Sequence, residues 1–432
     1  WKVVAQSAAS TSASCRAIGQ FGELGVKTEI SLFSEPGRNP LLFVKMWLYN
    51  RTSRAITIRS MGIASLHLDA RAYGGKTSFS FWTFQGGTYP ERPDWIFPLT
   101  SGFPRDNFQG MNAPDYGGGM PIVDLWTKRG GIALASLATE PKPISLPVRV
   151  DENGSVSVGL VDSTSFTLSP DDSAAVVPFV VILHEGDYFN ALQTYASTMR
   201  ANGFVPAPTP TSSYEPEWCA WGYGRDFKVE QILATLPKVK ELGFGWVTID
   251  DGWQSANGDW KPWRKKFPRS DPEFRELVDS IHAAGLKARL WWVPLEAHDL
   301  TYSEKHFPMR KNEFGMQIQS EVGALHPEWF QLNANGSRTQ VSWWNSYMLC
   351  PAVKEVREYY VAVTTRMLHD WKFDGFKIDG QNLNSVPPCY NPLHHHRSPE
   401  DAPKAVPEFF RELYHAAVIV RPDVVLYVCP CG

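Results

Sequence analysis

The residues with the clearest chemical potential are Lys377 and Asp379, at the end of the mostly apolar run from Phe373 to Ile378. A short apolar run that stops at an acid and a glycine is typical of a buried strand reaching the rim of a sheet. Side chains two apart on a strand point the same way, so the ammonium would lie beside the carboxylate and keep it ionised. An ionised carboxylate at a strand end is a candidate nucleophile. A structural salt bridge at the strand terminus is the alternative interpretation.

A second acidic group consists of Asp250 and Asp251, which follow the apolar run 246–249. Tryptophans end other apolar runs, at Trp221 and Trp291. Carboxylates accept hydrogen bonds from hydroxyls and indole rings cover the faces of sugar rings, so this combination suits a neutral polyol. A helix cap or a pair of metal ligands is the alternative for the two aspartates, but no cluster of His or carboxylates close to them in the sequence supports a metal.

These residues need a scaffold that brings several strand ends together, and the chain after residue 217 has the matching rhythm. We expect strands at 218–222, 246–249, 287–293, 373–378 and 424–428, alternating with helices at 228–242, 271–284, 351–367 and 406–420. This alternation predicts a parallel sheet, and chemistry at each strand end favours an α/β (TIM-type) barrel with its site at the carboxyl-terminal rim. About five of the eight strands can be counted, and the long segment 294–349 shows no clear period.

The first part of the chain has a different pattern. Short runs rich in β-branched and aromatic residues, separated by turn clusters, occur at 41–48, 55–58, 65–68 and 155–158. They predict an N-terminal β-sandwich, and a helical period follows at 187–202. The stretch from Val205 to Tyr214 is rich in Pro, Thr and Ser, as linkers are. We therefore expect a multidomain chain: a β-sandwich domain at 1–204, a linker at 205–217 and an incomplete barrel at 218–432.

The composition narrows the class of protein. The chain has 432 residues, 43% of them hydrophobic, and a formal net charge of -3, which fits a soluble globular protein. It has no basic run for phosphates, so we expect no nucleic-acid partner, and no apolar stretch long enough to span a membrane. The six cysteines are scattered and do not resemble a disulfide framework, which leaves the compartment open, cytoplasmic or secreted. The chain opens without Met, so we expect its native N-terminus to be missing.

Three motifs occur in an order that resembles the α-galactosidases of glycoside hydrolase family 36, which are retaining enzymes. The motifs are Trp-Cys-Ala-Trp at 218–221, Ile-Asp-Asp-Gly-Trp-Gln at 249–254 and Lys-Ile-Asp-Gly at 377–380. The resemblance covers nearly the whole chain, including the β-rich first part. It implies a hydrolase that removes terminal α-linked galactose from oligosaccharides or glycoconjugates by double displacement, without a cofactor.

The resemblance also implies roles for individual residues. Asp379 would be the nucleophile, and Lys377 would bind a sugar hydroxyl near C3 and C4. Asp250 and Asp251 would read the 4-hydroxyl and 6-hydroxyl that mark galactose. The remaining residues expected to bind substrate are Trp221 and Trp291 as walls of the subsite, Cys429 or Cys431 near the 2-position, and Arg338 by a looser match.

The chain departs from the family pattern in its second catalytic group. A retaining glycosidase needs two carboxyl groups about 5–5.5 Å apart. The resemblance places the acid/base on a sixth barrel strand, whereas the sequence stops at Gly432 after the fifth. We therefore expect a fragment truncated after the fifth strand, with its acid/base absent. If the chain alone proved active, the second carboxylate would have to be found among Asp226, Asp259 and Asp299.

Two further motifs contain residue types that commonly bind metal ions. Consecutive side chains diverge on a loop, so we expect His394-His395-His396 to line the aglycone side rather than to bind a metal. Cys429-Pro-Cys431 has no second cysteine pair, so a close-packed strand end is the expectation rather than a redox or zinc site. We expect no metal.

Several functions stay open beside hydrolysis of α-galactosides. An α-N-acetylgalactosaminidase would differ only in the pocket for the 2-substituent, and a galactosyl transferase of the raffinose-synthase type only in its acceptor. A non-catalytic sugar-binding protein is the alternative from another class. The expected partner is an α-galactoside oligosaccharide or glycoconjugate, and a homo-oligomer remains open.

Overall fold

The structure is a computed structural model, and it describes residues 2–68, 81–86, 95–107, 119–140, 142–152, 155–301, 319–341, 344–380 and 386–429. The chain divides into two compact units, residues 1–206 and 207–431, and each is described by itself. None of the helices in the described ranges is both long and apolar enough to cross a membrane.

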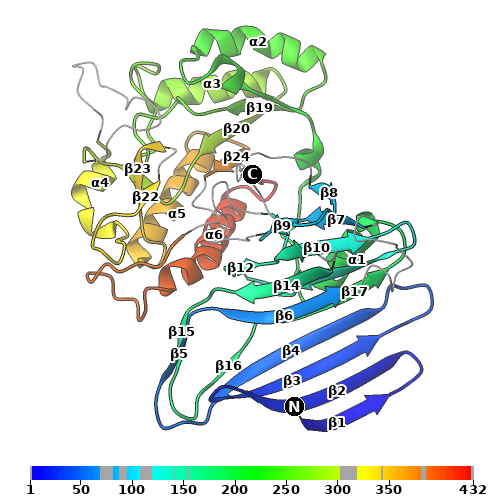
Figure 1. Cartoon of the computed structure of the whole chain (residues 1–432). Coiled ribbons are helices and arrows are strands. Elements are labelled where there is room, and N and C mark those ends of the chain that lie inside the picture. Colours follow the sequence, from blue (N-terminus) through cyan, green and yellow to red (C-terminus); the bar gives the residue numbers. More distant parts are fainter. Residues whose placement is uncertain are drawn as a thin grey trace. The chain divides into compact units, whose positions relative to one another are not determined.

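In its described residues the first unit contains antiparallel sheets and the helix α1 (Figure 1). Its elements are β1 (Lys2–Ala8), β2 (Ser12–Phe21), β3 (Leu24–Phe33), β4 (Leu41–Asn50), β5 (Ile56–Ile58), β6 (Met61–Leu68), β7 (Trp82–Gln85), β8 (Ile96–Pro98), β9 (Pro104–Arg105), β10 (Ile122–Trp126), β11 (Gly131–Ser136), β12 (Ile144–Ser145), β13 (Val148–Val150), β14 (Val156–Asp162), β15 (Phe166–Leu168), β16 (Ser173–Ala175), β17 (Phe179–His184) and α1 (Tyr188–Ala201). A ten-stranded sheet has the order β1-β2-β3-β4-β17-β11-β10-β7-β8, with β16 paired to β4. A five-stranded sheet has the order β12-β14-β13-β9, with β6 paired to β14, and β15 pairs with β5.

The core of this unit lies between the two larger sheets. Alternation places Val148 and Val150 inside while Arg149 faces out, and the buried side chains pack in one cluster with those of β10 and β17. Helix α1 buries Tyr195 against the other face of the ten-stranded sheet, and the Tyr195 hydroxyl donates to Ser136 O at 2.8 Å. The region is therefore sandwich-like, as the pattern of short strands predicts.

The second unit is organised around a curled five-stranded parallel sheet in the order β18-β19-β20-β24-β25. Its strands are β18 (Glu217–Cys219), β19 (Trp246–Ile249), β20 (Lys287–Trp292), β24 (Gly375–Asp379) and β25 (Val425–Cys429). Each strand pairs in parallel with the next along the chain. Parallel neighbours in sequence order are the arrangement of half a β/α barrel, and all the carboxyl ends meet at one edge.

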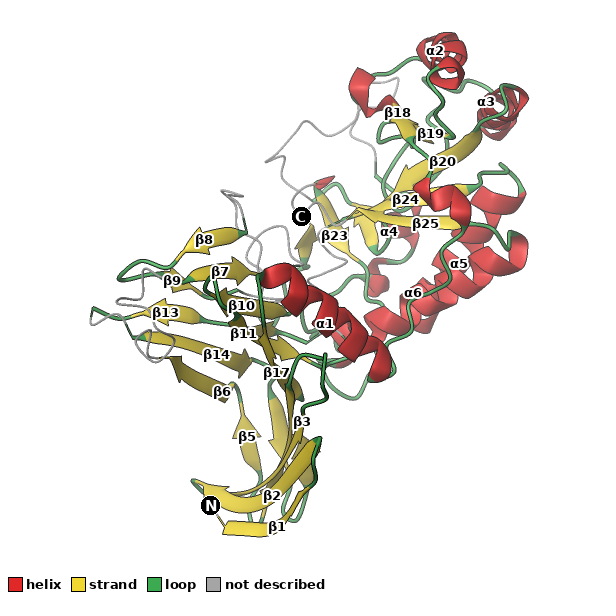
Figure 2. Ribbon diagram, turned by 90° about the vertical axis from the view of Figure 1, so that its right-hand side faces the viewer, coloured by secondary structure: helices red, strands yellow, loops and turns green. Residues whose placement is uncertain are grey.

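Helices connect these strands and gather on one side of the sheet (Figure 2). They are α2 (Val229–Glu241), α3 (Asp271–Ala283), α5 (Lys354–His369) and α6 (Asp401–Val420). In each the apolar residues recur every three or four positions, so one stripe is buried, as Phe274, Leu277 and Ile281 show in α3. This stripe joins a single large core with the strands.

Several sequence predictions need correction. The segment 294–349, in which the sequence shows no clear period, contains α4 (Glu321–Leu325) and an antiparallel three-stranded sheet of β21 (Glu296–His298), β23 (Ser346–Met348) and β22 (Gln340–Val341). These elements are too short to show a period. The expected strand 218–222 ends at Cys219, because Ala220–Tyr223 forms a turn of 3-10 helix. Helix α5 begins three residues after Pro351, and α6 begins five residues before 406 and contains Pro407.

The buried carboxylate of Asp374 ties three elements of the second unit together just before β24. Its Oδ2 accepts from the Ala288 backbone N–H of β20 at 2.7 Å and from His282 Nε2 of α3 at 2.8 Å. Its Oδ1 pairs with Arg421 after α6. A buried carboxylate with three donors holds the strand and both helices in one arrangement.

We predict that Asp374→Ala lowers the free energy of unfolding of the second unit by about 2–4 kcal/mol. The substitution leaves the side chains of His282 and Arg421 and the Ala288 backbone N–H without their common acceptor. Urea unfolding followed by tryptophan fluorescence measures the loss. The matched control is Asp279→Ala, whose exposed pair with Arg275 spans one helical turn and should contribute about 0.5 kcal/mol or less. Equal losses in the two variants would contradict the role given to Asp374.

Candidate active site at the carboxyl edge of the parallel sheet

An ion pair joins two strands of the parallel sheet that are not neighbours. Lys377 of β24 reaches past β20, and its Nζ lies 2.8 Å from Asp250 Oδ2 at the end of β19. Both side chains are buried or nearly so. From the sequence we expected the Lys377 ammonium to lie beside the carboxylate of Asp379, two residues along the same strand. In the structure the ammonium of Lys377 pairs with Asp250, because a curled sheet brings alternate strands together across its concave face.

Asp250 accepts from further donors besides Lys377. Cys219 Sγ donates to the same Oδ2 atom at 2.9 Å, and the Asp251 backbone N–H donates to Oδ1 at 2.8 Å. Burial alone would lower the pKa of Lys377, but the charge and hydrogen bond of Asp250 outweigh it and raise that pKa. Burial, together with the charge of Asp250, raises the pKa of the Cys219 thiol to about 12. Lys377 is therefore cationic and Cys219 a neutral thiol at neutral pH.

Asp379 lies at the end of β24 with both carboxylate oxygens oriented. Trp291 Nε1 of β20 donates to Oδ2 at 2.9 Å, and the Gly380 backbone N–H donates to Oδ1 at 2.8 Å. Gly380 has φ of 132°, which a glycine adopts readily and other residues do not. Trp291 is buried, with 1% of its surface exposed. The structure thus makes Trp291 a hydrogen-bond donor to the carboxylate, whereas the sequence suggested a wall of the subsite.

Asp251 begins a chain of polar contacts that leads away from the sheet edge. Arg225 Nε donates to its Oδ2 at 2.5 Å and Gln254 Nε2 to its Oδ1 at 2.8 Å. Gln254 also donates to Asn257 Oδ1 at 3.0 Å. The turn that allows this is tight: Gly252 has φ of 119°, and a Cβ there would lie 2.3 Å from the Arg225 carbonyl oxygen.

Sequence reasoning missed Glu296, which ends this chain of contacts. Asn257 Nδ2 donates to Glu296 Oε1 at 2.6 Å, and Oε2 is buried without a hydrogen-bond partner among the described residues. Burial raises the pKa of Glu296 well above its usual range; the hydrogen bond from Asn257 opposes this, and the charges of Asp251 and Asp379 add to it. Glu296 is thus a neutral carboxyl group next to the acidic cluster. Its only sequence signal was its position just after the end of the strand 287–293.

The other predicted substrate residues lie in several places. Trp221 is in the 3-10 turn after β18, exposed by 48%, with the Arg225 guanidinium 5.5 Å from its ring. Cys429 ends β25 in register with Asp379. Arg338 pairs with Asp299 at 2.9 Å and lies over the Phe330 ring. Cys431 falls outside the described residues.

The three carboxylates named as possible second catalytic groups have other surroundings. Asp226 is exposed. Asp259 accepts from the backbone N–H groups of Glu321 and Val322 and so caps α4. Asp299 is engaged by Thr301 and Arg338, and although burial opposes it, these contacts lower the pKa of Asp299.

Among the described residues, the only group of side chains that could hold a metal ion does not include Asp250 or Asp251. Within the described part of the chain, one group of side chains has its ligand atoms close enough to hold an ion, and it consists of Cys350, Cys389, His394 and His396. Two of these are histidines of the triple-His motif, which we expected to line the aglycone side. The sequence reasoning considered those histidines without the two cysteines.

No family model matches the chain. Over 371 residues it is 31% identical to the A type blood alpha-D-galactosamine galactosaminidase of Flavonifractor plautii, which covers 81% of this chain and 32% of that protein. The structure is similar to the α-galactosidase AgaA of Geobacillus stearothermophilus in complex with raffinose, with a TM-score of 0.64 and 17% identity over 97% of this chain and 55% of that one. For the α-galactosidase of Lactobacillus brevis the TM-score is 0.63, with 15% identity over 99% of this chain and 56% of that one.

These relatives are glycoside hydrolases. Enzymes built on a β/α barrel place their active sites at the carboxyl edge of the parallel sheet, which is where this chain has its acidic residues. More particularly, the chain has the fold of the family 36 α-galactosidases over part of their length. The resemblance seen in the three sequence motifs is therefore confirmed. The chain spans about half the length of these solved structures and about a third of the length of the galactosaminidase.

We predict that Cys219 reacts slowly with iodoacetamide at pH 8, because a thiol with a pKa of about 12 is protonated there, and that its rate rises as pH approaches 12. Asp250→Asn removes the nearby charge, so it lowers the pKa of Cys219 and accelerates alkylation at pH 8. Peptide mass spectrometry measures the rate, with Cys15 as internal reference. Asp251→Asn is the matched control, since Asp251 is not the acceptor of the Cys219 thiol. Identical rates in the two variants would contradict the coupling.

Proposed function

We propose that the protein to which this chain belongs is a retaining glycoside hydrolase that removes terminal α-linked galactose. The observation that carries the proposal is the placement of Asp379, whose carboxylate is oriented by Trp291 and Gly380 at the carboxyl edge of a family 36 type sheet. A carboxylate held in this orientation at the sheet edge can attack an anomeric carbon. The relatives named above support the same chemistry.

In the proposed reaction Asp379 attacks C1 of the galactoside and displaces the aglycone. The new bond between Asp379 and C1 makes a covalent glycosyl-enzyme. Water then attacks C1 from the opposite face and releases galactose with net retention. A general acid must protonate the leaving oxygen and then activate the water as a base. We assign that role to none of Asp226, Asp259 and Asp299, because the first is exposed and the other two are held by structural contacts.

We assign galactose recognition to the residues around the Lys377–Asp250 pair. Lys377 can donate to a hydroxyl near C3 and C4 while it stays paired with Asp250, because an ammonium carries three donors. Asp250 and Asp251 would accept from the 4-hydroxyl and 6-hydroxyl. Trp221, exposed at the same edge, suits the face of a sugar ring. We keep Arg338 in this set on its looser match to the family pattern, and Cys431 as the alternative to Cys429.

We infer that the five parallel strands form part of an eight-stranded barrel. In β25 the side chains of Tyr427 and Val428 are exposed by 45% and 49%, and within the described ranges β25 pairs only with β24. An apolar strand edge of this kind is normally covered by another strand. The domain limits 1–204, 205–217 and 218–432 also stay predictions. The structural division between residues 206 and 207 falls within the predicted linker.

A second candidate function is hydrolysis of a galactoside with a nitrogen substituent at C2. The specific observation is the relative from Flavonifractor plautii, whose name gives a galactosaminidase. Cys429, in register with Asp379 on the neighbouring strand, is the residue we place near the 2-position. Galactosyl transfer and silent sugar binding have no such observation in their favour.

We predict that a 2-deoxy-2-fluoro-galactosyl fluoride labels Asp379, because the fluorine slows the second step and lets the ester accumulate. Asp379→Ala should lower kcat by at least about 10³-fold, and azide should rescue it, since a small anion can take the place of the missing carboxylate. Peptide mass spectrometry locates the label and circular dichroism checks the fold. A label on another carboxylate, or near-native kcat in Asp379→Ala, would remove Asp379 from the role.

We predict that Asp250→Asn and Asp251→Asn each lower kcat/KM for a p-nitrophenyl α-galactoside by about 10–100-fold and reduce its preference over the α-glucoside, because each charge-assisted hydrogen bond contributes about 1.5–3 kcal/mol. Measured on the unmodified protein, the ratio of kcat/KM for the α-galactoside and the α-galactosaminide separates the two candidate functions. Variants that keep the galactoside-to-glucoside ratio would make the two aspartates structural.

A further inference from the structure

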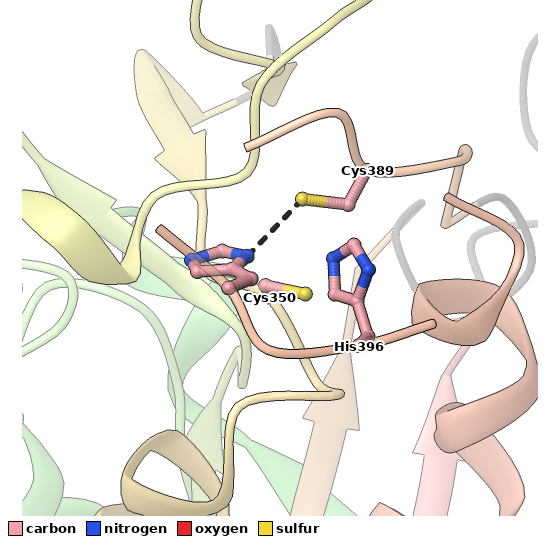
Figure 3. Close-up of side chains that lie close together, drawn as sticks. Cys350, Cys389 and His396 are labelled. Carbon is pink, nitrogen blue, oxygen red and sulfur yellow. Dashed lines mark hydrogen bonds between the residues drawn. The ribbon is translucent and has the colours of Figure 1, made fainter. Parts of the chain in front are cut away.

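Four side chains lie close together, Cys350, Cys389, His394 and His396. Figure 3 labels Cys350, Cys389 and His396. The ligand atoms of all four lie within 4.8 Å of one another. Both cysteines are fully buried. In the close-up, the thiols of Cys350 and Cys389 and the imidazole of His396 face one common point.

The four residues come from two parts of the chain that the fold brings together. Cys350 directly follows Leu349, which bridges to Phe330, and precedes α5. The other three lie in the connection from β24 to α6. This connection is held by hydrogen bonds from Gln331 Nε2 to Pro387 O at 2.6 Å and from the Tyr390 N–H to Leu332 O at 2.8 Å.

The two imidazoles are oriented as metal ligands are. His394 Nδ1 lies 3.3 Å from Cys389 Sγ, and its other nitrogen, Nε2, lies 2.7 Å from the Glu328 carbonyl oxygen. A ligating histidine typically donates its second N–H to a backbone carbonyl, which selects the tautomer that leaves the first nitrogen free to bind. His396 Nε2 is buried and has no hydrogen-bond partner of normal geometry among the described residues. His395, between them, is exposed.

Two thiols and two imidazoles are the donor set of a structural zinc site. In a tetrahedral zinc site the ligand atoms lie about 3.3–3.8 Å apart, given Zn–S of about 2.3 Å and Zn–N of about 2.0–2.1 Å. The cluster, whose ligand atoms all fall within 4.8 Å, reaches this geometry by a small inward movement of its side chains. Soft sulfur with imidazole selects zinc over magnesium or calcium.

We propose that Cys350, Cys389, His394 and His396 form a zinc-binding site that fixes the connection following β24 to the segment preceding α5. With four protein ligands the site has no open position for substrate or water, so its role is structural. Its first ligand after β24, Cys389, lies ten residues after Asp379 along the chain. The inference does not depend on the proposed hydrolysis and would hold for a sugar-binding protein as well.

The test is the metal content of the purified protein, measured by inductively coupled plasma mass spectrometry after dialysis against a metal-free buffer. We expect about one zinc per chain in the unmodified protein and in His395→Ala, the matched control whose side chain is exposed. Cys389→Ser and His394→Ala should fall below about 0.1 zinc per chain. His394→Cys should retain zinc, because a set of three cysteines and one histidine also binds it.

A second measurement covers the case in which a ligand variant fails to fold. Replacement of zinc by Co²⁺ in the unmodified protein should produce the intense visible and thiolate charge-transfer absorption of tetrahedral cobalt with sulfur ligands. Less than about 0.1 zinc per chain in protein produced with added zinc would overturn the proposal. So would equal zinc in His394→Ala and the unmodified protein, or a Cys350–Cys389 disulfide found by mass spectrometry under non-reducing conditions.

Discussion

The candidate active site depends on one buried ion pair, between Lys377 and Asp250. The pair links strands β24 and β19 across β20, so it can form only when the parallel sheet is curled and in register. Removing one partner of a buried pair leaves an uncompensated charge and costs about 3–5 kcal/mol. The pair therefore stabilises the curvature of the sheet and at the same time places an ammonium at its carboxyl edge. One interaction thus serves both the fold and the site.

The charge balance around this pair explains how several acids share a small region. Asp250 is compensated by Lys377, and Asp251 by Arg225. Asp379 is oriented by two neutral donors, the Trp291 indole and the Gly380 N–H. Neutral donors hold a carboxylate in place while leaving more of its negative charge for an electrophile than a bound cation would. Glu296, fully buried beside these acids, is kept neutral by burial and so adds no further negative charge.

The connections of the second unit are as important as its strands. Segment 294–349 contributes Glu296 and a small antiparallel sheet, and the connection after β24 contributes Cys389 and His394. Loops that leave the carboxyl edge of a parallel sheet need separate means of holding their shape, because the sheet itself stabilises only their first residues. The buried polar network that ends at Glu296 and the proposed zinc site are two such means.

The sequence alone determined the properties that depend on neighbours along the chain. Period and composition located most strands and helices, including β19 at 246–249. Motif order indicated the family 36 type of fold and gave Asp250, Asp251, Lys377 and Asp379 as candidate site residues. Tertiary structure alone decided which partners these side chains meet. It paired Lys377 with Asp250, turned Trp291 inward as a donor, and brought Cys350 to Cys389 and His394. The physical reason is that burial and long-range pairing depend on how strands curl and loops return, and local sequence patterns carry no information on contacts between residues far apart in the chain.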